Sequence, residues 1–276
     1  MKKIILLITA LIFSLGINAQ LDRSIMPVGG PAPKIKLDKP KEFKLKNGIR
    51  VLVVENHKLP RINYSLRFNR NPIVEGDKAG VLSLLGSMLG NGTTNIPKDE
   101  FNEEVDYLGA SINIGFGSGF AFTLTKNNER VLELFSDAII NPLLVEEEFE
   151  KEKEKLIEGL KTQQKDIDAI SGRVAGALSY GKNHAYGEFI TEQTINNVKF
   201  SDILEYQQKY FTPNNVYIVA IGDVDYKKVK SLISEKFGEW KKGKIWNGKK
   251  YDNKGNIVAT FMNGEETLNK IFRNCP

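Results

Sequence analysis

Cysteine and histidine are almost absent from this chain of 276 residues. Its single cysteine is Cys275, so no disulfide can form within the chain. Its two histidines are His57 and His184, so no pair stands four residues apart, the spacing with which one helix face holds a metal ion. The sequence therefore offers neither a disulfide framework nor a histidine pair for metal binding.

Long apolar runs are also lacking, apart from one at the start of the chain. Residues 4–15 are mainly apolar, follow Lys2 and Lys3, and lead into small and polar residues that end at Ala19. This layout is typical of a secretory signal peptide over residues 1–19, and the run is shorter than the about 20 residues of a membrane span. The alternative is a buried N-terminal helix. We expect export, with the bacterial periplasm as the compartment and no membrane span after signal cleavage.

A strong excess of one charge is the third absence. The chain has 39 basic and 34 acidic residues, and the net charge of +5 is spread along the sequence. Nucleic-acid binding calls for a dense basic face with interleaved aromatic residues, and the sequence shows none. We therefore expect no nucleic-acid partner.

What is present is a mixture of strand and helix patterns. Residues 20–42 are rich in proline and glycine and predict an extended lead-in. Asn47-Gly48 between two alternating apolar runs predicts a hairpin, and residues 62–69 predict a further strand. We expect the remaining strands at 110–125, broken by Gly117 and Gly119, and at 216–221. We expect helices at 77–89 with Asp77 as N-cap, 98–108, 129–140, 146–165 with a loose continuation to 178, 201–210 and 227–237. Because the early strands come as hairpins, the predicted class is α+β, a mostly antiparallel sheet with helices packed on one face.

The segment from Gly80 to Thr93 resembles the signature helix of the pitrilysin/insulinase family of zinc peptidases, which includes the mitochondrial processing peptidase. That helix usually has the pattern Gly-x-x-His-x-x-Glu-His-Met-x-x-x-Gly-Thr. Four residues of its outer frame are kept here: Gly80, Met88, Gly92 and Thr93. The three positions of the metal-binding and catalytic residues are changed: Ser83 and Ser87 replace the histidines, and Gly86 replaces the glutamate.

Other segments resemble the same family in the same order. Residues 109–114 are similar to its edge strand, and residues 149–160 to the helix that carries its third metal ligand. Gly159 stands where that glutamate is expected, with Glu158 one place before it. Four later segments also match: 183–187, 210–215, 221–225 and 237–240. The resemblance implies a peptidase-like N-terminal α+β domain over 43–240, one half of the family's two-domain unit. Residues 241–276 are then a linker or tail, and the second domain is expected to be absent.

In the family, two histidines and a glutamate hold zinc, and the glutamate between the histidines activates the bound water. A serine hydroxyl is a poor zinc ligand at neutral pH, and glycine offers no side chain. We therefore expect no metal, no cofactor and no peptidase activity. Glu158 lies in a helix crowded with Glu and Lys, so an ion-paired surface position is favoured over metal binding. His57 and His184 are expected to have loop and local packing roles.

Serine chemistry is the remaining catalytic alternative, with Ser83 or Ser87 as nucleophile and His184 as base. The sequence has neither a Gly-x-Ser-x-Gly elbow nor a Ser-x-x-Lys pair at these positions, which argues against it.

The resemblance also implies that extended peptide binds to a sheet edge, a mode that needs no zinc. The edge positions are Asn113, Ile114, Gly115 and Phe116; the alternative is an ordinary strand. The first hypothesis is a non-catalytic subunit that holds peptide and forms a hetero-oligomer with an active zinc peptidase. The second is a peptide-binding or assembly protein without proteolysis. The third is a truncated, non-functional family member.

Overall fold

The computed structural model describes Gly30 and residues 39–243, 248–251 and 257–261. The predicted signal peptide and nearly all of the lead-in before residue 39 lie outside the described residues. No helix in the described ranges is long and apolar enough to cross a membrane.

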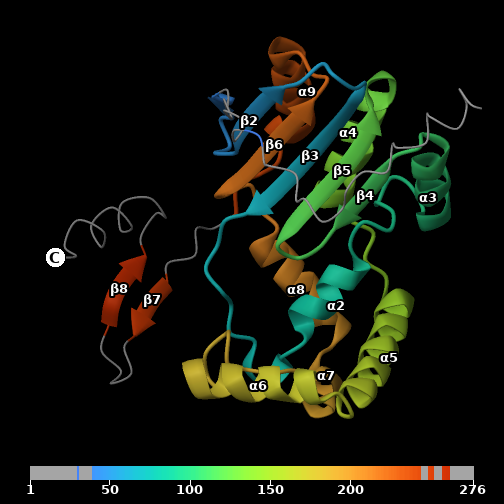
Figure 1. Cartoon of the computed structure of the whole chain (residues 1–276). Coiled ribbons are helices and arrows are strands. Elements are labelled where there is room, and N and C mark those ends of the chain that lie inside the picture. The colour runs from blue at the N-terminus through green and yellow to red at the C-terminus, as the bar shows by residue number, and fades with distance from the viewer. Residues whose placement is uncertain (1–29, 31–38, 244–247, 252–256, 262–276) are drawn as a thin grey trace, which may run out of the picture. The chain divides into compact units, whose positions relative to one another are not determined.

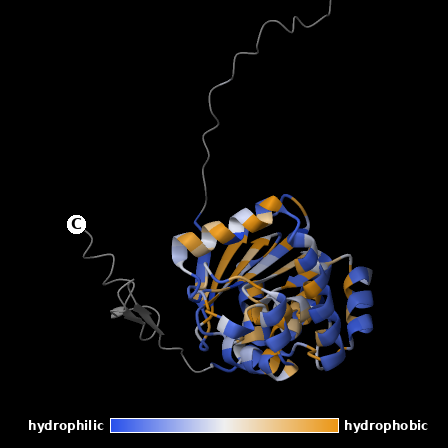
Figure 2. Ribbon diagram, turned by 90° about the horizontal axis from the view of Figure 1, so that it is seen from below, coloured by the Kyte–Doolittle hydropathy of each residue, from blue (hydrophilic) through white to orange (hydrophobic). Residues whose placement is uncertain are grey.

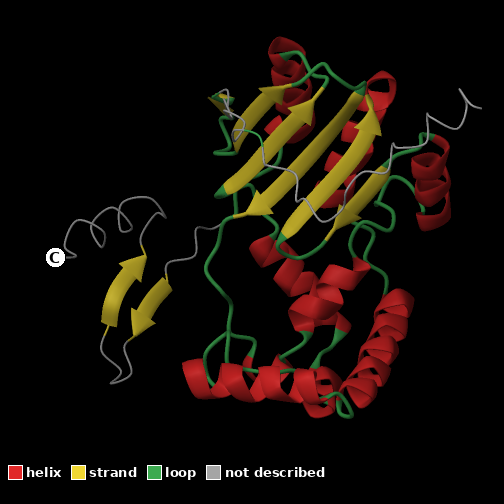
Figure 3. Ribbon diagram, viewed as in Figure 1, coloured by secondary structure: helices red, strands yellow, loops and turns green. Residues whose placement is uncertain are grey.

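A six-stranded sheet lies within residues 39–243 (Figures 1 and 3). Its strands are β1 (Lys41–Lys44), β2 (Arg50–Glu55), β3 (Arg61–Phe68), β4 (Ser111–Ile114), β5 (Ser118–Leu124) and β6 (Val216–Gly222). They lie in the order β1-β2-β6-β3-β5-β4, and all neighbouring pairs are antiparallel except β2 and β6. The predicted hairpin at Asn47-Gly48 is confirmed as the link between β1 and β2.

One face of the sheet is buried and the other carries no helix in the described part of the chain. On β3 the buried side chains are Ile62, Tyr64, Leu66 and Phe68, and the residues between them are polar. Helices α4 (Asn128–Ile140) and α9 (Tyr226–Gly238) cover the buried face, as Figures 1 and 3 show. This strict alternation is the pattern of a strand with one wet face. The predicted α+β class is confirmed.

The other helices form a layer beyond the end of the sheet (Figure 1). They are α2 (Val81–Met88), α5 (Glu146–Gln163), α6 (Ile167–Tyr180), α7 (Glu192–Asn197) and α8 (Phe200–Tyr210). Helix α2 packs against both α5 and α8, so it lies at the centre of this layer. Helix α3 (Lys98–Tyr107) leads into the edge strand β4.

The predicted start of the signature helix at Asp77 is wrong. Asp77 lies in a separate 3-10 turn, η1 (Gly76–Lys78), and α2 begins at Val81. The carboxylate at the helix start belongs to Glu75, whose Oε2 accepts hydrogen bonds from the backbone N–H groups of Gly80 (3.0 Å) and Leu82 (2.9 Å). The turn folds the chain back so that this longer side chain, rather than a local cap, satisfies the free donors.

The expected helix from 146 through 178 is instead two helices. Asp166 accepts hydrogen bonds from the N–H groups of Asp168 and Ala169 and so begins α6 as a new helix. The strand pair at 110–125 breaks at the turn formed by Phe116 and Gly117, whereas Gly119 lies inside β5. Glycine is favoured at this strand position because a β-carbon there would lie 3.0 Å from the ring of Phe135.

Strand β1, the first strand of the predicted hairpin, begins at Lys41, inside the predicted lead-in. Three smaller elements were not expected from the sequence: the short helix α7, which lies between α6 and α8, and two strands near the end of the chain. Strands β7 (Gly248–Tyr251) and β8 (Ile257–Phe261) pair antiparallel within the predicted linker or tail.

Candidate peptide-binding site

Helix α2 presents its serines to solvent. Ser83 and Ser87 are exposed, one turn apart, with Gly86 between them. The opposite side of the helix is buried in the core through Val81, Leu84, Leu85 and Met88. The Ser87 hydroxyl donates to the carbonyl of Leu84 at 2.9 Å, a local bond common for a serine within a helix.

Helix α5 packs beside α2, as the resemblance to the zinc helices implies. Gly159 is exposed, and a β-carbon there would have no neighbour within 4 Å. The side chain of Glu158 is 72% exposed, and its carboxylate lies 2.8 Å from the ammonium of Lys161 one turn later. The expected ion-paired surface position of Glu158 is confirmed.

These residues do not fit a zinc ion. A catalytic zinc takes three protein ligands from imidazole, thiolate or carboxylate groups. Ser83, Ser87 and Gly159 supply none of these, and no group of three or more such side chains gathers within the described ranges. His57 lies in a loop, where its Nδ1 is 2.7 Å from Asp223, and the pKa of that carboxyl is lowered by this contact and a hydrogen bond from Thr125.

His184 also has a local partner. Its imidazole stacks on the ring of Tyr180 with the centroids 5.4 Å apart, and its Nδ1 accepts from the backbone N–H of Tyr186. Both expected histidine roles are confirmed by these contacts.

Strand β4 is the outermost strand of the sheet on this side. Gly115 donates to the carbonyl of Ser118 at 2.8 Å, which closes the hairpin to β5. Hydrogen bonding alternates along an antiparallel pair, so Asn113 bonds to β5 whereas Ile112 and Ile114 direct their N–H and C=O groups outward. No strand among the described residues pairs with this edge. The sequence predicts this strand, but it does not predict that Ile112 directs its main-chain groups outward.

The end of β4 lies directly on helix α2. A β-carbon on Gly86 would lie 3.4 Å from the backbone nitrogen of Phe116, and one on Gly90 would lie 3.3 Å from that of Ile114. The structure therefore brings together Gly86, from the altered signature helix, with Ile114 and Phe116, from the predicted edge. At Gly90, which follows the helix, a β-carbon would be tight and the φ of +75° favours glycine, whereas at Gly86 the contact would be an ordinary one.

The sequence also misses Arg70, which lies just beyond β3. Its guanidinium carbon is 3.8 Å from the ring centroid of Phe116. One terminal nitrogen donates to the carbonyl of Tyr210 at 2.8 Å, and the other donates to the carbonyl of Phe116. Burial lowers the pKa of Arg70 to about 10. An arginine after a strand among asparagines gives no sequence signal that separates it from a surface arginine.

The face of the sheet next to this edge is partly apolar, and no described helix or strand covers it. Phe120, which pairs with Asn113, and Ile221 are each 42% exposed. Polar Asn63 and Ser65 lie between their strands on the same face. An extended peptide on β4 would therefore find both apolar and polar surface beside it.

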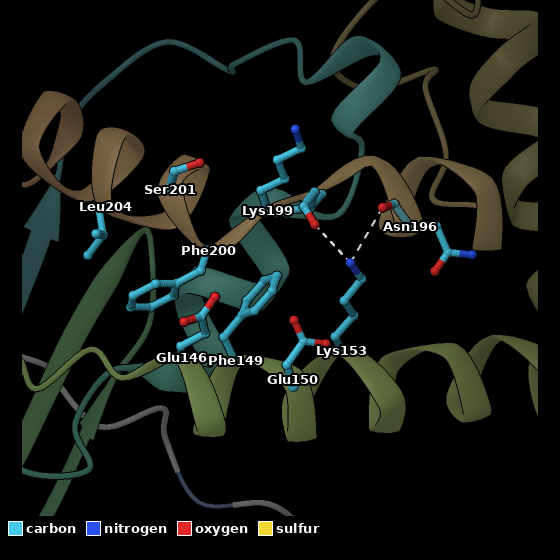
Figure 4. A pocket seen from close by; sticks show the side chains of 10 residues that line it. Glu146, Phe149, Glu150, Lys153, Asn196, Lys199, Phe200, Ser201 and Leu204 are labelled. Carbon is cyan, nitrogen blue, oxygen red and sulfur yellow. Dashed lines mark hydrogen bonds between the residues drawn. The ribbon is translucent and has the colours of Figure 1, made fainter.

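A shallow pocket of about 490 Å³ lies elsewhere, between the start of α5 and α7–α8 (Figure 4). Its base is formed by Phe149, Phe200 and Leu204. The ammonium of Lys153 in its wall donates to the carbonyls of Val198 (2.8 Å) and Asn196 (3.4 Å), so this cation fastens α5 to α7. None of its lining residues belongs to the site expected from the sequence.

Two family models match the chain. The one described as "Insulinase (Peptidase family M16)" matches residues 73–179, and the one described as "Peptidase M16 inactive domain" matches residues 197–271. An uncharacterized zinc protease of Rickettsia felis is 25% identical over 234 residues, which are 82% of this chain and 55% of that protein. The β subunit of the rat mitochondrial-processing peptidase is 24% identical over 75% of this chain and 44% of its own.

Solved structures show the same fold. A peptidase M16 inactive domain from Pseudomonas fluorescens has a TM-score of 0.68 at 18% identity, over 77% of this chain and 53% of its own. A Helicobacter pylori protease has a TM-score of 0.67 at 24% identity, over 82% of this chain and 54% of its own. The chain spans about half the length of the relatives it matches. Together, the ordered motifs, both family models and the fold establish that the chain belongs to the pitrilysin/insulinase family of peptidases, family M16.

Proposed function

We propose that the chain is a non-catalytic, peptidase-like subunit that holds extended peptide on the edge of β4 and partners an active zinc peptidase of its own family. One observation carries the proposal. The edge of β4, with which no described strand pairs, lies against a helix whose Ser83, Gly86 and Ser87 cannot hold a metal ion or activate water. The site keeps the means of binding a peptide without the means of cutting it.

The edge supports binding by strand addition. Ile112 and Ile114 together offer two N–H donors and two C=O acceptors on the outer side. In strand addition, such main-chain bonds supply affinity, and alternate side chains of the peptide supply specificity. Peptide side chains on the Asn113 side would lie over the open face beside Phe120.

Helix α6 supports the existence of a protein partner. None of its residues is buried, although it carries apolar side chains at helical spacing. Ile167 and Leu178 are 81% and 83% exposed, and Val174 lies between them on the same face. In Figure 2 the ribbon of α6 is largely orange and white, whereas α3 and α5 are mostly blue. An exposed apolar stripe of this kind marks an interaction surface.

Export to the periplasm is part of the proposal. Its support is the signal-like pattern of residues 1–19 and the likeness of fold to the periplasmic protease PqqL of Escherichia coli, with a TM-score of 0.62 at 18% identity. The motif resemblance is the support for two further parts of the proposal: the loss of the metal-binding and catalytic residues at Ser83, Gly86, Ser87 and Gly159, and the domain boundaries at 43–240.

The test is capture of partners from the native cell envelope with the tagged full chain, followed by peptidase assays. We expect recovery of a homologue that contains His-x-x-Glu-His. Its cleavage of peptides should increase when this chain is added, while the chain alone holds no stoichiometric zinc and cuts nothing. The matched variant is Leu178→Glu, which places a charge on the α6 stripe.

Other results would contradict the proposal. One zinc per purified chain, lost when Glu158 or His184 is replaced, would show an unrecognised metal site. Peptide binding without any co-purifying peptidase would favour a peptide-binding or assembly protein instead.

A further inference from the structure

Arg70 is a cation enclosed by aromatic rings and carbonyl groups. Its guanidinium carbon lies within 3.8 to 6.0 Å of the ring centroids of four residues: Phe68, Phe116, Tyr210 and Phe211. Its two terminal nitrogens each donate to one backbone carbonyl, those of Tyr210 and Phe116. A guanidinium has five N–H donors, so this arrangement leaves donors for a further acceptor.

Within the part of the chain that the structure describes, no anion accompanies the enclosed cation. No aspartate or glutamate in the described ranges forms an ion pair with Arg70, whereas the more exposed Arg130 pairs with both Glu104 and Glu133. Burial without a counter-charge disfavours the charged form, which is why the pKa of Arg70 falls to about 10. Arg70 remains charged at neutral pH, and an anion beside it would offset the cost of its burial.

Arg70 lies at the turn that follows the edge strand β4. Ile112 and Ile114 direct their main-chain groups outward. Phe116 follows two residues after Ile114, in the turn that joins β4 to β5. The carbonyl of Phe116 is the one that accepts from Arg70. The guanidinium therefore lies at the tip of the β4–β5 hairpin, two residues along the chain from the end of the edge strand β4.

From this juxtaposition we propose that Arg70, fixed by the Phe116 and Tyr210 carbonyls and stacked on the Phe116 ring, binds a carboxylate of the peptide held on β4. The inference rests on the proposed function, because it names the chemistry recognised at one end of the same edge. A planar guanidinium recognises carboxylate through paired N–H donors, with stacking on an aromatic ring to fix its plane. The carboxylate is either the free C-terminus of the peptide or an aspartate or glutamate side chain.

The first experiment measures the Arg70 site without any peptide. The arginine Nε–Hε resonances of the full chain are recorded by NMR during titration with acetylglycine and, in parallel, with acetylglycinamide. The resonance that is lost in Arg70→Gln identifies Arg70. We expect a saturable shift of this resonance with the carboxylate and none with the amide. Absence of a shift with acetylglycine overturns the proposal.

The second experiment separates the two sources of carboxylate. Randomised heptapeptides are captured on the chain as free acids and as C-terminal amides, and selected peptides are compared by fluorescence anisotropy. A preference of about tenfold for the free acid indicates the C-terminus. If amidated peptides with a glutamate bind more tightly than those with a glutamine by the same factor, the carboxylate is that of a side chain. Equal binding of all forms overturns the proposal.

Variants distinguish recognition from a structural role of Arg70. Arg70→Gln should reduce the ratio of acid to amide affinity to about one, and Arg70→Lys should restore only part of it. Thermal unfolding of each variant measures the effect of the substitution on stability. A loss of stability alone would not change the ratio of acid to amide affinity. Ile112→Pro should weaken all peptides and leave the acetylglycine shift intact. If Arg70 binds acetylglycine but no peptide binds, the carboxylate site stands and the proposed peptide-binding function fails.

Discussion

The replacement of Gly86 by alanine tests whether the altered signature helix has room for a side chain. A glycine within a helix is less favourable than alanine by about 0.5–1 kcal/mol. The new β-carbon would lie 3.4 Å from the Phe116 nitrogen and 3.8 Å from its β-carbon, which is ordinary contact. With no steric cost to set against the gain, Gly86→Ala should raise the free energy of unfolding by about 0.5–1 kcal/mol. For a domain of this size, 1 kcal/mol raises Tm by about 2–4 °C.

Gly90 is the matched control for this prediction. It also lies against β4, at 3.3 Å from the Ile114 nitrogen, but its φ is +75°. Alanine in that left-handed conformation costs about 1–2 kcal/mol, so Gly90→Ala should lower Tm. Both variants are measured by thermal and urea unfolding followed by circular dichroism. A fall in Tm for Gly86→Ala of 2 °C or more would refute the reasoning, because it would mean that the hairpin tip leaves no space at position 86.

Three further predictions concern the edge, the core and the helix start. Ile112→Pro should weaken peptide binding at least about tenfold with little loss of stability, because it removes an outward N–H and no hydrogen bond to β5. The control Ile112→Val should bind peptide normally. Fluorescence anisotropy measures the binding, and Tm measures the stability. Phe135→Ala should lower the free energy of unfolding by about 3–5 kcal/mol, since its side chain is fully buried; a urea titration showing less than 1 kcal/mol would contradict the core assignment. Burial raises the pKa of Glu75, so the native state takes up a proton before the unfolded chain does. Stability relative to Glu75→Gln should therefore fall as pH rises from about 4.3 through the raised pKa; unfolding curves at pH 4 to 7 with no such divergence would count against it.

Local pattern was enough to predict the strands and most helices. Alternation identified β3 to within one residue at each end, because a strand with one wet face must alternate. The Asn47-Gly48 turn gave the first hairpin for a similarly local reason. The position of β6 between β2 and β3 has no such local signal, since strand order is decided by packing between distant segments.

The same limit explains the errors. Asp77 and Glu75 are both acidic residues before an apolar run, and only the fold of the intervening turn decides which carboxylate reaches the helix. The break before α6 depended on Asp166, a capping residue hidden within a charged helical pattern. At the site, motif resemblance selected Gly86 and the β4 edge, but Arg70 could not be predicted, because only the fold brings it to the end of α8 and the hairpin tip.

The place of β6 in the sheet has a consequence for how the chain folds. β6 is the last of the six strands in sequence, yet it hydrogen-bonds to β2 and β3 on either side. Until residue 222 has left the ribosome, the β1–β2 hairpin and the β3–β5–β4 group have no common sheet, and each keeps an unpaired edge. Such long sequence separation slows folding and leaves unpaired edges that invite aggregation or chaperone binding. Shortened chains that stop before Val216 should therefore collect as insoluble material.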